Sequence, residues 1–279
     1  MKLSSYINLI LKLENSNTLS ESDSFSIDGF DRAILILDDI EDQSLIRDGK
    51  PSFHVEYGTL EAKKEAEKLY KNTFRTLGNI CKQRKLGIIK SFYVRFLLKR
   101  LYKKIQLGQY IDRQLQQTTV ISPRLLLKYD RMILLFTGGH IKYAFLVGSL
   151  LSNQKASYKN QVASIGEDIG MLRQIDDDIK DYEGYHHEPL GDLINHKKRL
   201  PELLFQLYAS SDEKMKLKSL LSNPAGNRTE IEKLIFNENV QRYISEKIAE
   251  IKTRIEMKIN TLPENYKFRM NQLMLEFLR

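Results

Sequence analysis

Two stretches of the chain contain the same acidic pattern, and they decide how the whole sequence is interpreted. The first is LDDIEDQSLIRDGKP, residues 37–51, and the second is GEDIGMLRQIDDDIKDY, residues 166–182. Each contains Asp-Asp-x-x-Asp beside a largely apolar run. The acidic residues of the pattern are Asp38, Asp39 and Asp42 in the first stretch and Asp177, Asp178 and Asp181 in the second.

Helical geometry makes these clusters costly unless something binds them. Residues four apart lie on one face of a helix, so Asp38 stacks with Asp42, and Asp177 with Asp181. Like charges at that spacing cost roughly a few tenths of a kcal/mol per pair. A lone copy is typically a solvated acidic turn, but two copies with basic segments downstream favour a site for metal and phosphate. Mg²⁺ prefers carboxylate, water and phosphate oxygens.

The composition predicts an all-α fold. Leu, Lys, Ile and Glu are plentiful, whereas the 279 residues include only 14 glycines and 6 prolines, which favours helix. No stretch shows the alternation of a β-strand, and no linker divides the chain. We therefore expect a single domain over residues 1–279.

The net charge of +8 suits an anionic partner such as nucleic acid, a membrane surface or a phosphorylated small molecule. Basic residues recur along the chain, so we expect no nucleic-acid partner. The basic segment 82–104 is either a surface helix or a helix whose other face packs, and we favour packing.

The chain has one cysteine, Cys81, which excludes an internal disulfide and a cysteine-based zinc site. We find no signal sequence and no run long enough to span a membrane. The sequence therefore predicts a cytoplasmic protein that is not an integral membrane protein.

Hydrophobic periodicity predicts the elements that carry these motifs. We expect helices over residues 6–13, 30–42, 60–77, 88–105, 125–136, 140–151, 158–181 and 201–220, and two more after 231 that break near Pro263. Gly108 and Gln109 predict a break after the fourth helix. The pattern Thr229-x-x-Glu232 predicts a capping box.

Several ordered segments resemble the trans-isoprenyl diphosphate synthases. Residues 37–58 resemble the first aspartate-rich motif of that family, including the downstream Arg-x-Gly-x-Pro, and residues 166–182 resemble the second. Residues 191–201 (GDLINHKKRLP) resemble its GDLxxGKxTLP element, with His196 and Arg199 in place of Gly and Thr. Gly108-Gln109 matches the family's GQ pair. The resemblance extends from about residue 5 to the C-terminus.

The resemblance implies a helical bundle of the isoprenoid synthase type, in which the two clusters face each other across a central cavity. It also implies three Mg²⁺ ions that hold an allylic prenyl diphosphate. Loss of diphosphate leaves a carbocation, and groups that bind the developing negative charge stabilise that step. The implied metal ligands are Asp38, Asp39, Asp42, Asp177, Asp178 and Asp181, of which Asp181 has a supporting role. The implied diphosphate-binding residues are Arg47, Lys197 and Gln174.

Some positions depart from the family pattern, and they concern the acceptor, isopentenyl diphosphate. Asp48 stands where a second arginine is usual, and Phe136 replaces a diphosphate-binding lysine. The upstream GGKxxRP element is missing, so the chain looks as if it lacks the family's first helix. Three explanations stay open: ordinary chain elongation, which we favour; another acceptor or cyclisation; and a weakly active subunit of a heteromeric synthase.

Three further expectations follow. In the family, bulky residues four and five places before the first cluster block the tunnel for the growing chain. Here they are Ile34 and Ala33, and the small Ala33 suggests a medium or long product. His186, His187 and His196 fit a loop near phosphate better than a second metal site. The resemblance also implies a homodimer.

Overall fold

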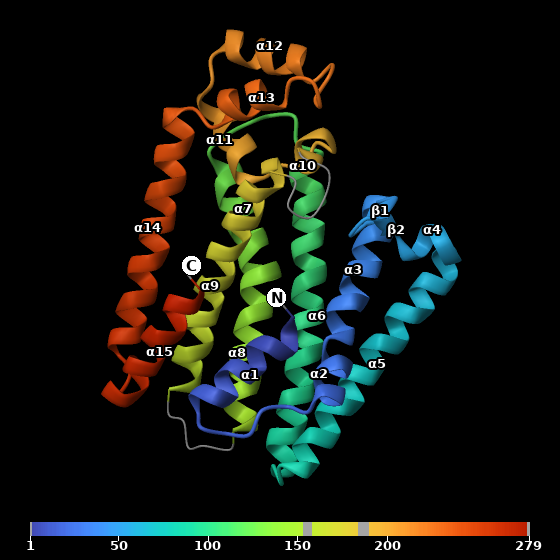
Figure 1. Cartoon of the computed structure of the whole chain (residues 1–279), viewed down its shortest axis with the longest axis vertical. Coiled ribbons are helices and arrows are strands. Elements are labelled where there is room, and N and C mark those ends of the chain that lie inside the picture. Colours follow the sequence, from blue (N-terminus) through green and yellow to red (C-terminus); the bar gives the residue numbers. More distant parts are fainter. Residues whose placement is uncertain (1, 153–157, 184–189, 278–279) are drawn as a thin grey trace. The chain divides into compact units, whose positions relative to one another are not determined.

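The computed structural model describes residues 2–152, 158–183 and 190–277, and these residues are predominantly helical (Figure 1). The α-helices are α1 (Leu3–Leu13), α2 (Glu21–Ile27), α3 (Gly29–Asp42), α4 (Phe53–Tyr57), α5 (Thr59–Gln83), α6 (Ile88–Gln116), α7 (Arg124–Ile133), α8 (Gly139–Leu151), α9 (Lys159–Lys180), α10 (Gly191–Ile194), α11 (Leu200–Tyr208), α12 (Ser211–Leu220), α13 (Arg228–Ile235), α14 (Glu238–Asn260) and α15 (Glu264–Phe277). A π-helical segment, Leu134–Gly138, joins α7 to α8, and a 3₁₀ turn, Asp181–Glu183, follows α9. The prediction of an all-α fold is confirmed.

The chain divides into two compact units. Unit 1 contains residues 1–103, 140–166 and 258–279, and unit 2 contains residues 104–139 and 167–257. The first acidic cluster belongs to unit 1 and the second to unit 2. The expectation of a single domain stays a prediction.

In unit 1, helix α3 packs along α5, and the two lie side by side (Figure 1). Phe30 is fully buried, and its ring lies 6.2 Å from that of Tyr70 on α5. The Thr73 hydroxyl donates to the carbonyl of Ser26, 2.8 Å away. Asp28 immediately precedes α3 but accepts the backbone N–H of Ser4, so it anchors α1. These contacts fix the helix that ends in the first acidic cluster.

In unit 2, the π-helical segment lies directly against α9. A Cβ added at Gly170 would be 2.5 Å from the carbonyl oxygen of Thr137 and 2.6 Å from the Cα of Gly138. Both distances are shorter than any van der Waals contact, so only glycine fits at this crossing. The close approach fixes the second half of α9, which carries the second acidic cluster.

Three local predictions are wrong. Helix α6 continues through Gly108 to Gln116. A Cβ added at Gly108 would lie 3.5 Å from the backbone at Met132 and Phe136, so this glycine packs against the segment around Phe136. The single helix expected over residues 201–220 is two helices, α11 and α12, which are separated at Ala209 and Ser210. Helix α13 begins one residue before Thr229 without a side-chain cap. Residues 45–51 form a short antiparallel hairpin, β1 (Ile46–Arg47) and β2 (Lys50–Pro51).

A fourth correction concerns membrane spans. The continuous helical segment Arg124–Leu151 is long and apolar enough to span a membrane by length and composition, contrary to the sequence prediction. However, 72% of its most apolar 18-residue stretch is buried inside the structure. Such burial is typical of a core helix.

Candidate active site

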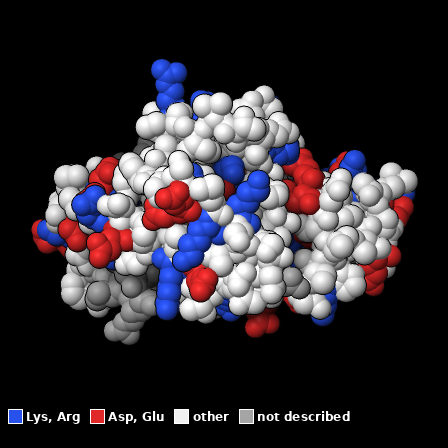
Figure 2. Space-filling model, turned by 90° about the horizontal axis from the view of Figure 1, so that it is seen from above, with Lys and Arg blue, Asp and Glu red and all other residues white. Residues whose placement is uncertain are grey.

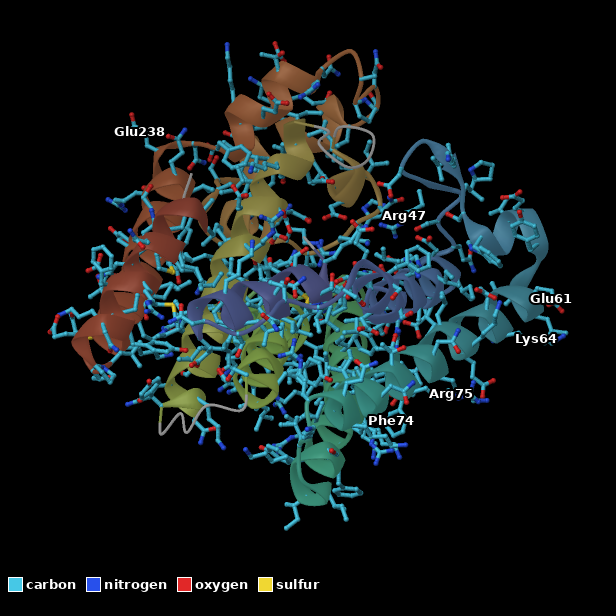
Figure 3. The ribbon with its side chains drawn as sticks, turned by 60° about the horizontal axis from the view of Figure 1, so that its bottom comes forward. Arg47, Glu61, Lys64, Phe74, Arg75 and Glu238 are labelled. Atoms are coloured by element: carbon cyan, nitrogen blue, oxygen red, sulfur yellow. The ribbon has the colours of Figure 1, made fainter. Side chains whose placement is uncertain are left out.

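The first acidic cluster lies at the C-terminal end of α3, where Gln43 adopts a left-handed conformation and ends the helix. Asp39 is buried and only 3% exposed. It accepts a hydrogen bond from Nε of Arg47 at 2.9 Å and a second from Nη2. Arg47 lies on the hairpin after α3 and is labelled in Figure 3. The cluster therefore contains its own counter-ion.

The other two aspartates of the first pattern remain partly accessible. The side chain of Asp38 is 25% exposed and lies 3.8 Å from Nη2 of Arg47, and Asp42 is also half-buried. Burial lowers the pKa of Arg47, but the hydrogen bond and charge of Asp39, with the charges of Asp38 and Asp48, raise it overall. Arg47 is therefore a permanent cation beside the carboxylates.

Backbone geometry explains why Asp48 follows Arg47. Asp48 and Gly49 connect the two strands, and both have positive φ angles, 50° and 73°. A two-residue hairpin loop with two positive φ angles is a type I′ turn, for which Asp-Gly is a preferred sequence. The acidic residue at this position therefore has a structural reason, independent of any ligand.

A cavity of about 320 Å³ lies beside α3 in unit 1. Its lining residues are Phe30, Ala33, Ile34, Leu37, Lys63, Ala66, Glu67, Tyr70, Lys71 and Tyr102. Ala33 and Ile34, the predicted chain-length residues, both belong to this lining. The wall is largely apolar and aromatic, and the acidic cluster follows it on the same helix.

The second acidic cluster has a buried middle member as well. Asp178 is 1% exposed and accepts hydrogen bonds from the Tyr129 hydroxyl at 2.6 Å, Nε2 of Gln174 at 2.9 Å and the backbone N–H of Leu200 at 3.3 Å. Burial raises the pKa of Asp178 to about 6, although Arg199 and the hydrogen bonds act in the opposite direction. Neutral donors therefore anchor Asp178, whereas a cation, Arg47, anchors Asp39.

The outer members of the second pattern are half-buried. Asp177 lies on the more accessible side of α9. Asp181 accepts the backbone N–H of Asp192 at 3.1 Å, and burial together with the charge of Asp192 raises its pKa to about 6. Lys197 lies 3.7 Å from the carboxylate of Asp192, which links the predicted diphosphate-binding lysine to the region around Asp181.

Gln174 is held from two sides. Its Oε1 accepts a hydrogen bond from the Thr137 hydroxyl at 2.5 Å, and its Nε2 donates to Asp178. The close contact at Gly170 brings Thr137 within reach. Phe136, which stands where the family has a lysine, precedes Thr137 in the π-helical segment.

Arg199 is a further cation of the site. From the sequence it was noted only as a departure from the family pattern. Arg199 is nearly buried, with a side chain 13% exposed, and it pairs with Asp112 and Asp192, both at 2.9 Å. Burial lowers the pKa of Arg199, but these carboxylates raise it well above its ordinary value. Sequence analysis missed Asp112, and the only signal was its position four residues after Gly108.

The donor set fits a hard cation, although the described part of the chain contains no group of three His, Cys, Asp or Glu side chains close enough to hold a metal. Asp39 and Asp178 are buried in hydrogen bonds with protein donors. The pairs Asp38 with Asp42 and Asp177 with Asp181 keep the half-exposed carboxylates that Mg²⁺ would need. His186 and His187 lie outside the described residues, and His196 is exposed.

Comparison with known proteins gives a consistent result. The family model described as polyprenyl synthetase matches residues 12–237. A short chain isoprenyl diphosphate synthase from Methanocaldococcus jannaschii is 26% identical over 205 residues, which is 72% of this chain and 60% of the relative. The match thus spans less than two thirds of the length of that relative.

Solved structures share the fold. A geranylgeranyl pyrophosphate synthase has a TM-score of 0.81 at 15% identity, covering 99% of this chain and 86% of its own. The geranylgeranyl pyrophosphate synthetase of Pyrococcus horikoshii has a TM-score of 0.78 at 18% identity, covering 99% and 85%. A polyprenyl synthase from Caulobacter crescentus, in complex with calcium and isoprenyl diphosphate, has a TM-score of 0.78 at 16% identity, covering 97% and 82%.

Proposed function

Because the chain belongs to the polyprenyl synthetase family, we propose that it is a Mg²⁺-dependent prenyltransferase that uses an allylic prenyl diphosphate as donor. One observation carries the proposal. In both acidic clusters the middle aspartate is buried and anchored by protein donors, while the first and last aspartates stay half-exposed. Asp38 and Asp42, and likewise Asp177 and Asp181, are thus partly exposed on one side of their helix, where a cation can reach them.

Each proposed role follows from the local chemistry. Bound Mg²⁺, expected as three ions, would neutralise the charge that develops on the leaving diphosphate. Arg47 presents a fork of donors suited to phosphate, and Lys197 offers a point charge. Gln174, fixed by Thr137 and Asp178, would hold the leaving group in one orientation. The apolar cavity beside α3 would exclude water from the carbocation.

The acceptor that we favour is isopentenyl diphosphate, which would give a longer trans-polyprenyl diphosphate. Asp48 does not argue against it as strongly as the sequence suggested, because the type I′ turn accounts for an Asp-Gly pair. Phe136, however, still stands in place of the family's diphosphate-binding lysine. Transfer to another acceptor, cyclisation, and a weakly active subunit of a heteromeric synthase remain the alternatives that the experiment separates.

The test is a product assay with Mg²⁺ and farnesyl diphosphate, with and without isopentenyl diphosphate. Longer prenyl diphosphates that form only with isopentenyl diphosphate support elongation. Release of diphosphate without elongation supports another acceptor. If neither occurs while a partner subunit restores activity, the chain is a subunit of a heteromeric enzyme. If no condition produces either product, the proposed activity is wrong.

Product length tests the cavity. We propose that the cavity accommodates the prenyl chain. Ala33→Phe should then shorten the product, because the new ring would occupy part of the cavity. Leu35→Phe is the matched control, since Leu35 lies on the same helix but is 41% exposed and does not belong to the lining. An unchanged product from Ala33→Phe would refute this placement. The expected homodimer and cytoplasmic location stay predictions.

A further inference from the structure

The segment before α11 carries three consecutive cations, Lys197, Lys198 and Arg199. Their side chains are only 18%, 15% and 13% exposed. On the face shown in Figure 2, lysines and arginines lie beside acidic residues, so exposed positive charge alone does not mark an anion site there. A cation that is nearly buried is more informative, since burying a charge without a partner is costly.

Arg199 pairs with carboxylates of two different elements in unit 2. Its Nη1 donates to Asp112, near the end of α6, at 2.9 Å. Its Nε donates to one oxygen of Asp192 on α10, also at 2.9 Å, and the other oxygen of Asp192 lies 3.7 Å from Nζ of Lys197. Asp192 therefore bridges Arg199 and Lys197, and Arg199 fixes this pair to α6.

The same segment contacts the second acidic cluster through its backbone at both ends. The N–H of Asp192 donates to the carboxylate of Asp181 at 3.1 Å, and the N–H of Leu200 donates to that of Asp178 at 3.3 Å. Between them, the N–H of Lys197 donates to the carbonyl of Asp192 at 2.8 Å. A shift of this segment would therefore move Lys197 and change the surroundings of both aspartates.

We propose that Arg199 is a positioning residue for Lys197: by anchoring Asp192 to α6, it holds the Lys197 ammonium beside the second acidic cluster, where a diphosphate would bind. Threonine, which the family pattern has at this position, has neither the charge nor the donors to bridge two carboxylates. A guanidinium suits this bridge because its donors are fixed in a planar fork. The inference rests on the proposed diphosphate-binding role of Lys197.

The test measures the binding of inorganic pyrophosphate in the presence of Mg²⁺ by isothermal titration calorimetry, so it does not require prenyl transfer. Lys197→Ala and Arg199→Thr should each weaken binding about tenfold, as expected for the loss of one hydrogen bond to a charged group. Because Arg199 acts through Lys197, the double variant should bind no more weakly than Lys197→Ala alone. Independent effects would instead multiply to about a hundredfold.

Lys198→Thr is the matched control, because it makes the same charge change at the neighbouring residue and also breaks an ion pair. Lys198 donates to the buried Glu202, four residues further along the chain, at 2.8 Å. This substitution should leave the affinity for pyrophosphate unchanged.

A second variant guards against loss of the fold. Arg199→Thr combined with Asp112→Asn removes the charge of the α6 carboxylate that Arg199→Thr alone would leave without its cation. It should bind pyrophosphate as weakly as Arg199→Thr. Circular dichroism verifies that each variant folds.

The outcomes separate this inference from the proposed function. If the wild type binds pyrophosphate and Arg199→Thr binds it equally well, or if the losses from Arg199→Thr and Lys197→Ala multiply, Arg199 does not act through Lys197. If Lys198→Thr weakens binding as much as Arg199→Thr, the net charge of the segment matters and the bridge does not. If the wild type does not bind pyrophosphate with Mg²⁺, the proposed function fails and this inference fails with it.

Discussion

The two acidic clusters share one sequence pattern but have different electrostatic surroundings. On α3, the buried Asp39 is held by a cation, Arg47, only eight residues further along the chain. On α9, the buried Asp178 is held by neutral donors from distant segments, among them Tyr129. The pattern therefore fixes the spacing of carboxylates, whereas the anchor of the middle aspartate depends on the neighbouring elements. The first cluster is compensated locally, and the second retains a raised pKa at Asp178.

The largest expected effect tests what the two clusters have in common. Asp38→Asn and Asp177→Asn should each lower the rate of prenyl transfer by about a hundred- to a thousandfold, because each removes a half-exposed charge proposed to bind metal at the leaving group. The rate is measured with saturating Mg²⁺.

The matched controls change a neighbouring charge on each helix. Glu41→Gln alters an exposed residue of α3, and Asp176→Asn alters a residue that pairs with Lys180 at 2.7 Å. Both should retain most of the activity. Equal losses in the controls would mean that the overall negative charge matters and the pattern does not.

The next effect concerns the cations of the two clusters. Arg199→Leu should destabilise the protein by about 3–5 kcal/mol, because Asp112 and Asp192 would keep their charges in a partly buried environment and lose the guanidinium that they share. Arg47→Leu should cost less, about 1–3 kcal/mol, since Arg199 pairs with two carboxylates at 2.9 Å, whereas Asp38, the second carboxylate near Arg47, lies 3.8 Å away. Urea unfolding of the metal-free protein measures both. A similar loss of stability from the two substitutions would remove the proposed contrast.

The third prediction concerns pH. Because the pKa of Asp178 is raised from 3.8 to about 6, its contribution to stability is complete below about pH 4 and is lost as the pH rises through 6. Between pH 4 and pH 7 the wild type should therefore lose up to about 3 kcal/mol that Asp178→Asn does not lose. Asp176→Asn should retain the pH dependence of the wild type.

Thermal unfolding of the metal-free proteins across this range provides the comparison. Asp181, whose pKa is also raised, changes in the same direction in all three proteins. An identical pH dependence for the wild type and Asp178→Asn would show that burial of Asp178 does not affect its ionisation.

The smallest effect distinguishes the packing of the two helices. Gly170→Ala should destabilise by about 1–3 kcal/mol, because its Cβ would overlap the backbone at Thr137 and Gly138. Gly29→Ala on α3 is the counterpart, since its Cβ would make ordinary contacts at 3.4–3.5 Å. It should be neutral or stabilise by up to about 1 kcal/mol. Urea unfolding separates the two, and equal effects would contradict the close crossing.

Part of the fold and site could be predicted from sequence because it depends on local chemistry. The paucity of glycine and proline predicted helices, and four-residue spacing predicted which aspartates share a face. The resemblance in residues 37–58 and 166–182 identified the family, which the family model confirms. The prediction of a break at Gly108 failed because the glycine fits a tertiary contact with the segment around Phe136.

By itself, the sequence determined the helical class, the family and the two carboxylate patterns, since these depend on composition and on residues within a few turns of one another. Only the tertiary structure decided which aspartate of each pattern is buried, because that depends on how each helix is rotated towards its neighbours. It also paired Arg199 with Asp112, 87 residues away. Such pairs form when burial removes water from groups that no local pattern connects.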